Sequence, residues 1–135
     1  MPVCSPSLAS EVKPLNTPED LAQHELLHVL GYEEGWGYWL KKAGANRIDS
    51  SQGLQFDTLI SALRMAELGQ GVALARSSLV EHMLAQGTLI APFEQRISTQ
   101  EAFYLVYSPL VTANPQAAAF IAWLVAQAQA THDDN

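Results

Sequence analysis

Short apolar runs separated by polar turns recur along the chain and predict its strands. The runs at 72–75 and 89–91 are bounded by glycine, serine or proline, as buried strands often are. A shorter run stands at 3–4, and residues 103–107 form the last one. Residues 48–56 alternate weakly between apolar and polar side chains, which predicts one further strand.

Between these runs, apolar residues recur at the spacing of a helix. Thr17-Pro18-Glu19-Asp20 has the residues of a capped helix start, and a short helix over 36–43 is expected to end at Gly44. Two further helices follow, the second of which ends at Gly87. Their candidate caps are Asp57 or Thr58 for the first and Ser77 or Ser78 for the second.

The last predicted helix opens at Asn114-Pro115 and has the most regular apolar stripe. The stripe consists of Ala117, Phe120, Ile121, Leu124, Val125 and Ala128. Strands that alternate with helices predict an α/β domain with a mainly parallel sheet. Such sheets bind ligands where strands end and helices begin, which points to the junctions 56–58 and 74–78.

The composition is that of a globular domain, with 48% hydrophobic and 16% charged residues among 135. No apolar run approaches the roughly 20 residues of a membrane span. The start of the chain, residues 1–6, lacks the basic end and apolar core of a signal peptide. Cys4 is the single cysteine and cannot form an internal disulfide. We therefore expect a cytoplasmic protein without membrane contact.

Acidic residues outnumber basic ones by 14 to 7, which gives a net charge of −7. A surface that binds duplex nucleic acid needs clustered lysine and arginine to displace counterions. Only Lys41, Lys42 and Arg47 come near such a cluster, and they are most simply a solvated face. We expect no direct nucleic-acid contact by this chain.

The stretch His24-Glu25-Leu26-Leu27-His28 matches the H-E-x-x-H zinc motif. On a helix, both histidines would share a face and bind zinc, while Glu25 would activate a water molecule. The further positions of longer metalloprotease motifs are occupied by Gly31 and Glu34. The apolar spacing permits a helix over 18–30, so a zinc-dependent hydrolase is one interpretation.

The other interpretation is a short apolar segment with solvent-facing histidines. Only 23 residues precede His24, too few for the sheet that usually backs such a helix. Met65 and Met83 lie inside helical patterns and not in the turn that such enzymes use. The chain also lacks a G-x-S-x-G motif, a glycine-rich phosphate loop with its lysine, and a C-x-x-C motif. We favour this interpretation and expect no enzyme, no metal and no cofactor.

Eight short motifs follow one another over nearly all of the chain. They are Pro2-Val3-Cys4-Ser5-Pro6, Pro14-Leu15-x-Thr17-Pro18-Glu19-Asp20-Leu21, Leu26-Leu27-His28, Trp36-x-x-Trp39-Leu40 with Ala43-Gly44, Gly69-Gln70-Gly71-Val72-Ala73-Leu74-Ala75, Gly87-x-Leu89-Ile90-x-Pro92-Phe93, Phe103-Tyr104-Leu105-Val106 and Ala119-Phe120-x-x-Trp123-Leu124. In this order the chain resembles the C-terminal part of the effector-binding (substrate-binding) domain of LysR-type transcriptional regulators, most of all their GcvA/AmpR-like branch.

The resemblance implies a periplasmic-binding-protein-like fold (type 2), in which two α/β lobes are joined by crossover strands and bind a small molecule between them. Residues 1–93 would form the second lobe with the crossover strands, and the segment 24–30 would be a strand. Residues 94–135 would supply the C-terminal strand and helix of an incomplete first lobe. The winged helix-turn-helix that binds DNA is absent, so the chain is expected to be a fragment or a shortened gene product.

The resemblance also implies which residues contact the effector. Family members place contacts at the helix start that corresponds to Phe56, Asp57 and Thr58, although Asp57 and Thr58 equally suit plain helix capping. Trp36 is a candidate wall of the cleft or a core residue, and Phe103 is a candidate aromatic contact or a sheet residue. The expected partners are a small organic effector and further copies of the chain. A free solute-binding protein of the same fold remains a second alternative.

Overall fold

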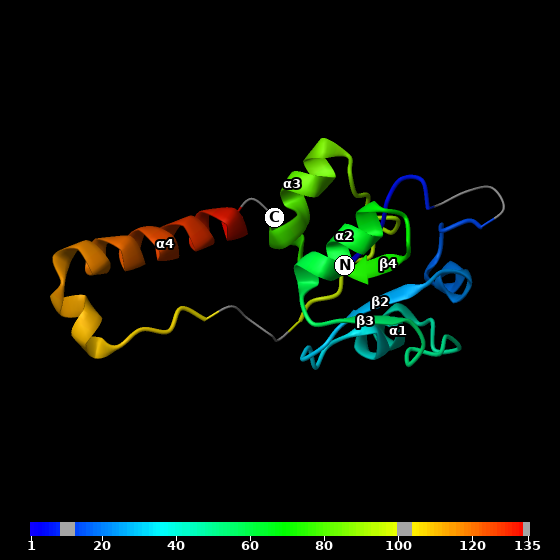
Figure 1. Cartoon of the computed structure of the whole chain (residues 1–135), viewed down its shortest axis with the longest axis horizontal. Helices are drawn as coiled ribbons and strands as arrows, with labels where there is room; N and C mark the ends of the chain where they lie inside the picture. Colours follow the sequence, from blue (N-terminus) through cyan, green and yellow to red (C-terminus); the bar gives the residue numbers. More distant parts are fainter. Residues whose placement is uncertain (9–12, 100–103, 134–135) are drawn as a thin grey trace. The chain divides into compact units, whose positions relative to one another are not determined.

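The structure is a computed structural model that describes residues 1–8, 13–99 and 104–133 (Figure 1). The chain divides into two compact units, Met1–Gln100 and Glu101–Asn135, called unit 1 and unit 2 below. Unit 1 contains a four-stranded sheet, and unit 2 contains a long helix. The predicted α/β class is confirmed.

The sheet of unit 1 is mainly parallel. Its strands lie in the order β1 (Pro2–Val3), β4 (Val72–Leu74), β2 (Leu26–Val29) and β3 (Leu54–Phe56). Strand β2 runs parallel to both of its neighbours, whereas β1 runs antiparallel to β4. The strand expected over 24–30 is therefore confirmed as β2, and the helical alternative for this segment is wrong.

Helices cover both faces of this sheet because successive strand residues point to opposite sides. On β2, Leu26 enters one core and Leu27 the other, and Val72 and Ala73 of β4 alternate in the same way. The first core is completed by residues of η1 (Pro18–Gln23) and α1 (Trp36–Ala43), and the second by residues of α2 (Leu59–Glu67) and α3 (Ser77–Gln86). The arrangement is a three-layer α/β unit.

The helix ends follow the predicted caps with one exception. Helix α1 ends at Gly44, whose φ of 83° is the left-handed conformation that glycine adopts readily. Helix α2 begins after Thr58, whose side chain accepts a hydrogen bond from Ser61. Helix α3 begins after Arg76, so neither Ser77 nor Ser78 is its cap. The reason is that Ala75 still pairs with Met1, and the helix starts one extended residue later.

The strand predicted over 48–56 is shorter than expected and covers only Leu54–Phe56. The carboxylate of Asp49 accepts hydrogen bonds from the backbone N–H and the hydroxyl of Ser51, at 2.9 and 2.6 Å. This local turn competes with strand pairing, as short polar side chains often do. Likewise, the run 89–91 makes a single bridge, between Ile90 and Cys4, and not a full strand.

Cys4, one of the two residues of this bridge, is fully buried. Burial raises the pKa of its thiol to about 11, so the thiolate that would act as a nucleophile is scarce at neutral pH. Cys4 is therefore a packed side chain of the core.

Unit 2 contains η2 (Pro109–Ala113) and α4 (Pro115–Asp133). The predicted helix start is confirmed, because the side chain of Asn114 accepts a hydrogen bond from the backbone N–H of Gln116 at 3.0 Å. The strand predicted over 103–107 is wrong for 104–107, which do not pair with any described strand, and Phe103 lies outside the described residues. None of the helices in the described chain combines the length and apolar character that crossing a membrane requires.

Candidate functional site

Three parallel strands bring their carboxyl ends to one edge of the sheet in unit 1. Strands β4, β2 and β3 are direct neighbours, and each is followed by a helix. Only two residues separate β3 from α2 and β4 from α3. The first amides of these helices have no partner within their own helix, so they collect at this carboxyl edge. Ligands of α/β sheets bind at such an edge, which makes it the candidate site.

Thr58 caps α2 at this edge, directly after Asp57, and both side chains are exposed. The Thr58 Oγ1 atom accepts a hydrogen bond from the backbone N–H of Ser61 at 3.3 Å and lies 2.8 Å from the Ser61 hydroxyl. This contact satisfies one of the unpaired amides and leaves Thr58 at the surface. Capping and ligand contact are therefore compatible at this residue, and the contact itself stays a prediction.

Phe56 and Trp36 are less exposed than Asp57 and Thr58. Phe56 is half-buried, packs against the core between the sheet and α2, and its carbonyl accepts a hydrogen bond from the backbone N–H of Leu30 at 2.8 Å. Trp36 is only 2% exposed, and its indole N–H donates to the carbonyl of Leu27 at 3.1 Å. The structure thus places Trp36 in the core, which is one of the two positions expected for it. Phe103 lies outside the described residues.

Arg76 is a residue of this edge that the sequence analysis did not single out. It is the last residue before α3 and follows β4 directly. Burial, together with the charges of Arg96 and Arg76, lowers the pKa of the Met1 amine to about 6, so positive charge collects near the end of β4. The signal that could have found Arg76 is a basic residue between a buried apolar run and a helix start. Arg76 thus adds a basic side chain to the edge that also carries Asp57.

The H-E-x-x-H stretch lies at the start of β2 and not on a helix. Four residues rise about 13 Å along a strand, so the two histidines cannot reach one metal ion. The His24 Nε2 atom lies 3.2 Å from the carbonyl oxygen of Pro14, whereas Nε2 of His28 donates to the carbonyl of Gln52 at 2.8 Å. Within the described residues no cluster of metal-ligating side chains occurs. The geometry of this segment does not support zinc chemistry.

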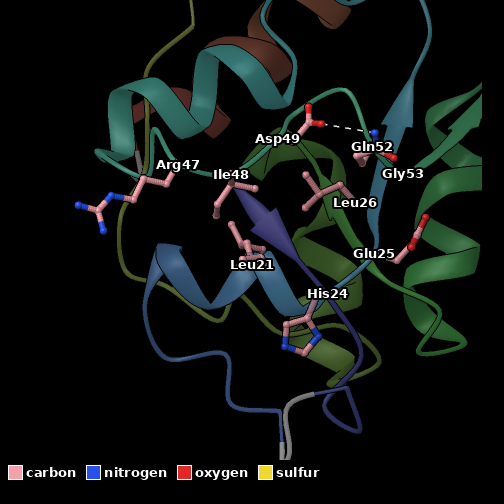
Figure 2. A pocket seen from close by; sticks show the side chains of 10 residues that line it. Leu21, His24, Glu25, Leu26, Arg47, Ile48, Asp49, Gln52 and Gly53 are labelled. Carbon is pink, nitrogen blue, oxygen red and sulfur yellow. Dashed lines mark hydrogen bonds between the residues drawn. The ribbon is translucent and has the colours of Figure 1, made fainter.

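A pocket of about 210 Å³ opens at the opposite, amino-terminal edge of β2 and β3. Figure 2 shows Leu21, Leu26 and Ile48 at its centre, whereas Arg47 and Glu25 point away from it in different directions. The third charged side chain, Asp49, already accepts hydrogen bonds from Ser51 and Gln52, so the pocket does not gather free charged groups that would orient a polar ligand. The carboxyl edge remains the better site.

Comparison with known proteins agrees with this geometry. The family model described as "LysR substrate binding domain" matches residues 1–129. The glycine cleavage system transcriptional activator of Escherichia coli (strain K12) is 38% identical over 133 residues, which are 98% of this chain and 43% of the relative. The HTH-type transcriptional activator AmpR of Citrobacter freundii is 33% identical over 97 residues, which are 71% of this chain and 32% of the relative.

A solved structure extends the likeness to the fold. The effector domain of the transcriptional regulator AmpR of Pseudomonas aeruginosa superposes with a TM-score of 0.74 at 27% identity, over 97% of this chain and 61% of that one. The chain spans less than half the length of the curated relatives it matches. Since the family model covers nearly the whole sequence and the first of these relatives exceeds 30% identity, the chain belongs to the LysR substrate-binding domain family.

Proposed function

We propose that the chain is the effector-sensing part of a LysR-type transcriptional regulator, acting in the cytoplasm. Residues 1–93 correspond to the second lobe of a periplasmic-binding-protein-like domain, and residues 94–135 belong to the first lobe. The antiparallel contact between Cys4 and Ile90 supports this division, because it sets the two crossings between the lobes side by side. Binding of DNA belongs to another part of such a regulator.

The effector is a small organic anion, and the observation that carries this proposal is the carboxyl edge. Helices α2 and α3 both begin there, and their unpaired amides and positive dipole ends favour a carboxylate or a similar group. Arg76 adds a full positive charge at the end of β4. Thr58 offers a hydroxyl that accepts or donates according to need.

Binding without chemical turnover is the activity that this edge supports. The matched relatives are named as regulators of transcription, which supports a role as a sensor and not as an enzyme. An effector changes the state of a regulator only by binding one conformation more tightly than another. A change in the spacing of the two lobes is the conformational change expected here. Neither a zinc-dependent hydrolase nor a free solute-binding protein has support from the relatives.

The proposal is tested by ligand titration of the 135-residue chain. The probes are glycine, larger amino acids and simple carboxylates, each first scored by the rise of the thermal midpoint and then by calorimetry. A probe that binds at the carboxyl edge loses about tenfold in affinity in Thr58→Val or Arg76→Gln, because each change removes a hydrogen bond to a charged group.

Thr17→Val is the matched control for the threonine change. Thr17 precedes η1, which leads into the amino end of β2, and its hydroxyl hydrogen-bonds to Asp20 at 3.1 Å. This variant loses a comparable helix-start contact away from the carboxyl edge and keeps its affinity. Equal affinity in Thr58→Val, Arg76→Gln and the parent chain would remove the effector site from this edge.

A further inference from the structure

The chain that follows α3 crosses unit 1 and runs toward the carboxyl edge. Ile90 pairs antiparallel with Cys4, and β1 runs antiparallel to β4, so the chain beyond Ile90 runs in the same direction as β4. Further on, the ring of Phe93 stacks on Trp39 of α1, with the ring centroids 5.9 Å apart. This direction carries the next residues toward the carboxyl ends of the parallel strands.

Two side-chain contacts hold this part of the chain, residues 93–99, at the carboxyl edge. The hydroxyl of Tyr38, in the first turn of α1, donates to the carbonyl of Ser98 at 3.3 Å. The hydroxyl of Thr99 donates to the carboxylate of Glu34, which lies in the loop between β2 and α1. Because this loop follows the carboxyl end of β2, residues 93–99 reach the candidate site. We call residues 93–99 the crossing segment.

Arg96 of the crossing segment lies near the same point as Arg76. Met1 exchanges two hydrogen bonds with Ala75, at 2.7 and 2.9 Å, directly before Arg76. Burial lowers the pKa of the Met1 amine, and the charges of Arg96 and Arg76 lower it further. Two guanidinium groups from distant parts of the sequence therefore lie near one atom at the carboxyl end of β4.

The acidic residue of the edge lies away from this pair of arginines. Asp57 follows β3, and β2 separates β3 from β4. Neighbouring strands are about 4.8 Å apart, so the ends of β3 and β4 are about 10 Å apart. Arg96 is exposed, and within the described chain neither Glu94 nor another carboxylate forms an ion pair with it. The amides at the start of α3 add to the positive potential at the end of β4.

We propose that Arg96 is an effector-binding residue and that, together with Arg76, it selects an effector with two negative charges. This inference rests on the proposed function, because both arginines act at the carboxyl edge. One carboxylate neutralises one guanidinium group, whereas a phosphate group or a pair of carboxylates engages both. The planar guanidinium group donates two parallel hydrogen bonds to either kind of anion. The ligand is therefore a small organic dianion, either a phosphate ester or a dicarboxylate.

Anion binding to the 135-residue chain tests the charge of the ligand. The probes are inorganic phosphate and succinate, with acetate as the singly charged reference, titrated by calorimetry at constant ionic strength and about pH 8, where phosphate carries nearly two charges. At least one dianion is expected to bind about tenfold more tightly than acetate. Tighter binding of phosphate identifies an ester, and tighter binding of succinate identifies a dicarboxylate. Equal affinity for all three probes overturns the proposal.

Variants of Arg96 test whether the dianion binds at this residue. Arg96→Gln is expected to lower the affinity for the dianion about tenfold, because it removes hydrogen bonds to a charged group. Arg96→Lys is expected to lie between this variant and the parent chain, since it keeps the charge and loses the planar fork. The thermal midpoint without anion verifies that each variant is folded.

Arg47→Gln is the matched control, because it removes the same charge at the opposite, amino-terminal edge (Figure 2). It is expected to keep the affinity of the parent chain. Equal losses in Arg96→Gln and Arg47→Gln would show that only the net charge matters, and they would overturn the proposal.

The two proposals fail in different ways. If a probe loses affinity in Arg76→Gln and keeps it in Arg96→Gln, the carboxyl edge remains the effector site and the role of Arg96 is wrong. If neither variant changes the affinity for any probe, both the site at this edge and the selection of a dianion are wrong.

Discussion

Unit 1 buries its apolar side chains in two cores, whereas the large side chains of Phe120 and Trp123 on α4 of unit 2 remain exposed. Both units are rich in apolar residues, so composition does not explain the difference. The sheet of unit 1 offers two faces, and helices cover each of them. The described part of unit 2 contains only η2 and α4, and a single layer cannot enclose a core. An apolar sequence becomes a core only when a second layer covers it.

A buried leucine of unit 1 and an exposed leucine of unit 2 should differ most in their contribution to the free energy of unfolding. Leu27 is 1% exposed in the core of unit 1, whereas Leu110 of unit 2 is 83% exposed. Leu27→Ala is expected to lower the free energy of unfolding by about 2–5 kcal/mol, since it removes buried methyl groups and leaves a cavity. Leu110→Ala is expected to change it by less than about 0.5 kcal/mol. Urea unfolding measures both changes, and equal losses of stability would contradict the difference in burial between the two units.

The glycine directly before β4, Gly71, tests how tightly unit 1 is packed. A Cβ atom on Gly71 would lie 2.5 Å from the carbonyl oxygen of Glu25 and 2.9 Å from the Leu27 side chain. Gly71→Ala is expected to cost about 1–3 kcal/mol, because backbone and core must both shift.

Gly37→Ala serves as the control for this change. The added Cβ would meet only the Ser50 side chain at 3.2 Å, inside helix α1, where alanine is the better helix former. This variant is expected to be neutral or more stable in the same urea titration. If Gly37→Ala lost as much stability as Gly71→Ala, the short contacts around Gly71 would not explain the loss.

The same kind of cap occurs in both units and should matter differently in each. Thr58→Val removes the bond to the Ser61 amide and is expected to lower the stability of unit 1 by about 1 kcal/mol. Asn114→Ala removes the bond to the Gln116 amide in unit 2. It is expected to reduce helical circular dichroism without moving the cooperative unfolding of unit 1. A shift of that transition in Asn114→Ala would show that the two units unfold together.

Asp20 makes a small contribution to the stability of unit 1 that depends on pH. Hydrogen bonds from the backbone N–H of Thr17, and then of Asn16, lower the pKa of Asp20 below its ordinary value. A carboxyl group with a lowered pKa stabilises the fold above its ordinary pKa of about 3.9, and this contribution is lost as the pH falls through the folded-state value.

Asp20→Ala is therefore expected to lower the thermal midpoint slightly at neutral pH and to match the parent chain in strong acid. Glu19→Ala, which removes the adjacent exposed carboxylate, is the control. A difference between Asp20→Ala and the parent that grows on acidification would contradict the assigned direction of the pKa.

Much of unit 1 could be predicted because local signals decide its elements. Gly44 fixes the end of α1 and Thr58 the start of α2, and both were recognisable from the sequence. Competition between local and tertiary contacts was not recognisable. The turn at Asp49 shortened one strand, and the pairing of Ala75 with Met1 moved the start of α3. The apolar spacing of 24–28 also fits a helix, and only the resemblance to a family identified it as a strand.

The position of the candidate site in the fold was easier to predict than the side chains that form it. The alternation of strands and helices located the carboxyl edge and the junction at Thr58. Trp36 packs in the core against Trp39 and donates to the Leu27 carbonyl, and no sequence pattern encodes these contacts. Arg76 was missed because a single basic residue forms no motif. The run 104–107 has strand composition, but a strand also needs a neighbour to pair with.

The paired backbone of Cys4 and Ile90 has a consequence for how unit 1 responds to mechanical force. Each residue donates its N–H to the carbonyl of the other, at 3.0 and 2.8 Å, so the first residues of the chain and the segment after α3 are held side by side. Strand β1 lies between the amino-terminal end and Cys4, so a force applied at Met1 reaches the pairing of β1 with β4 first. In a pulling experiment, β1 would therefore detach before the bonds between Cys4 and Ile90 open.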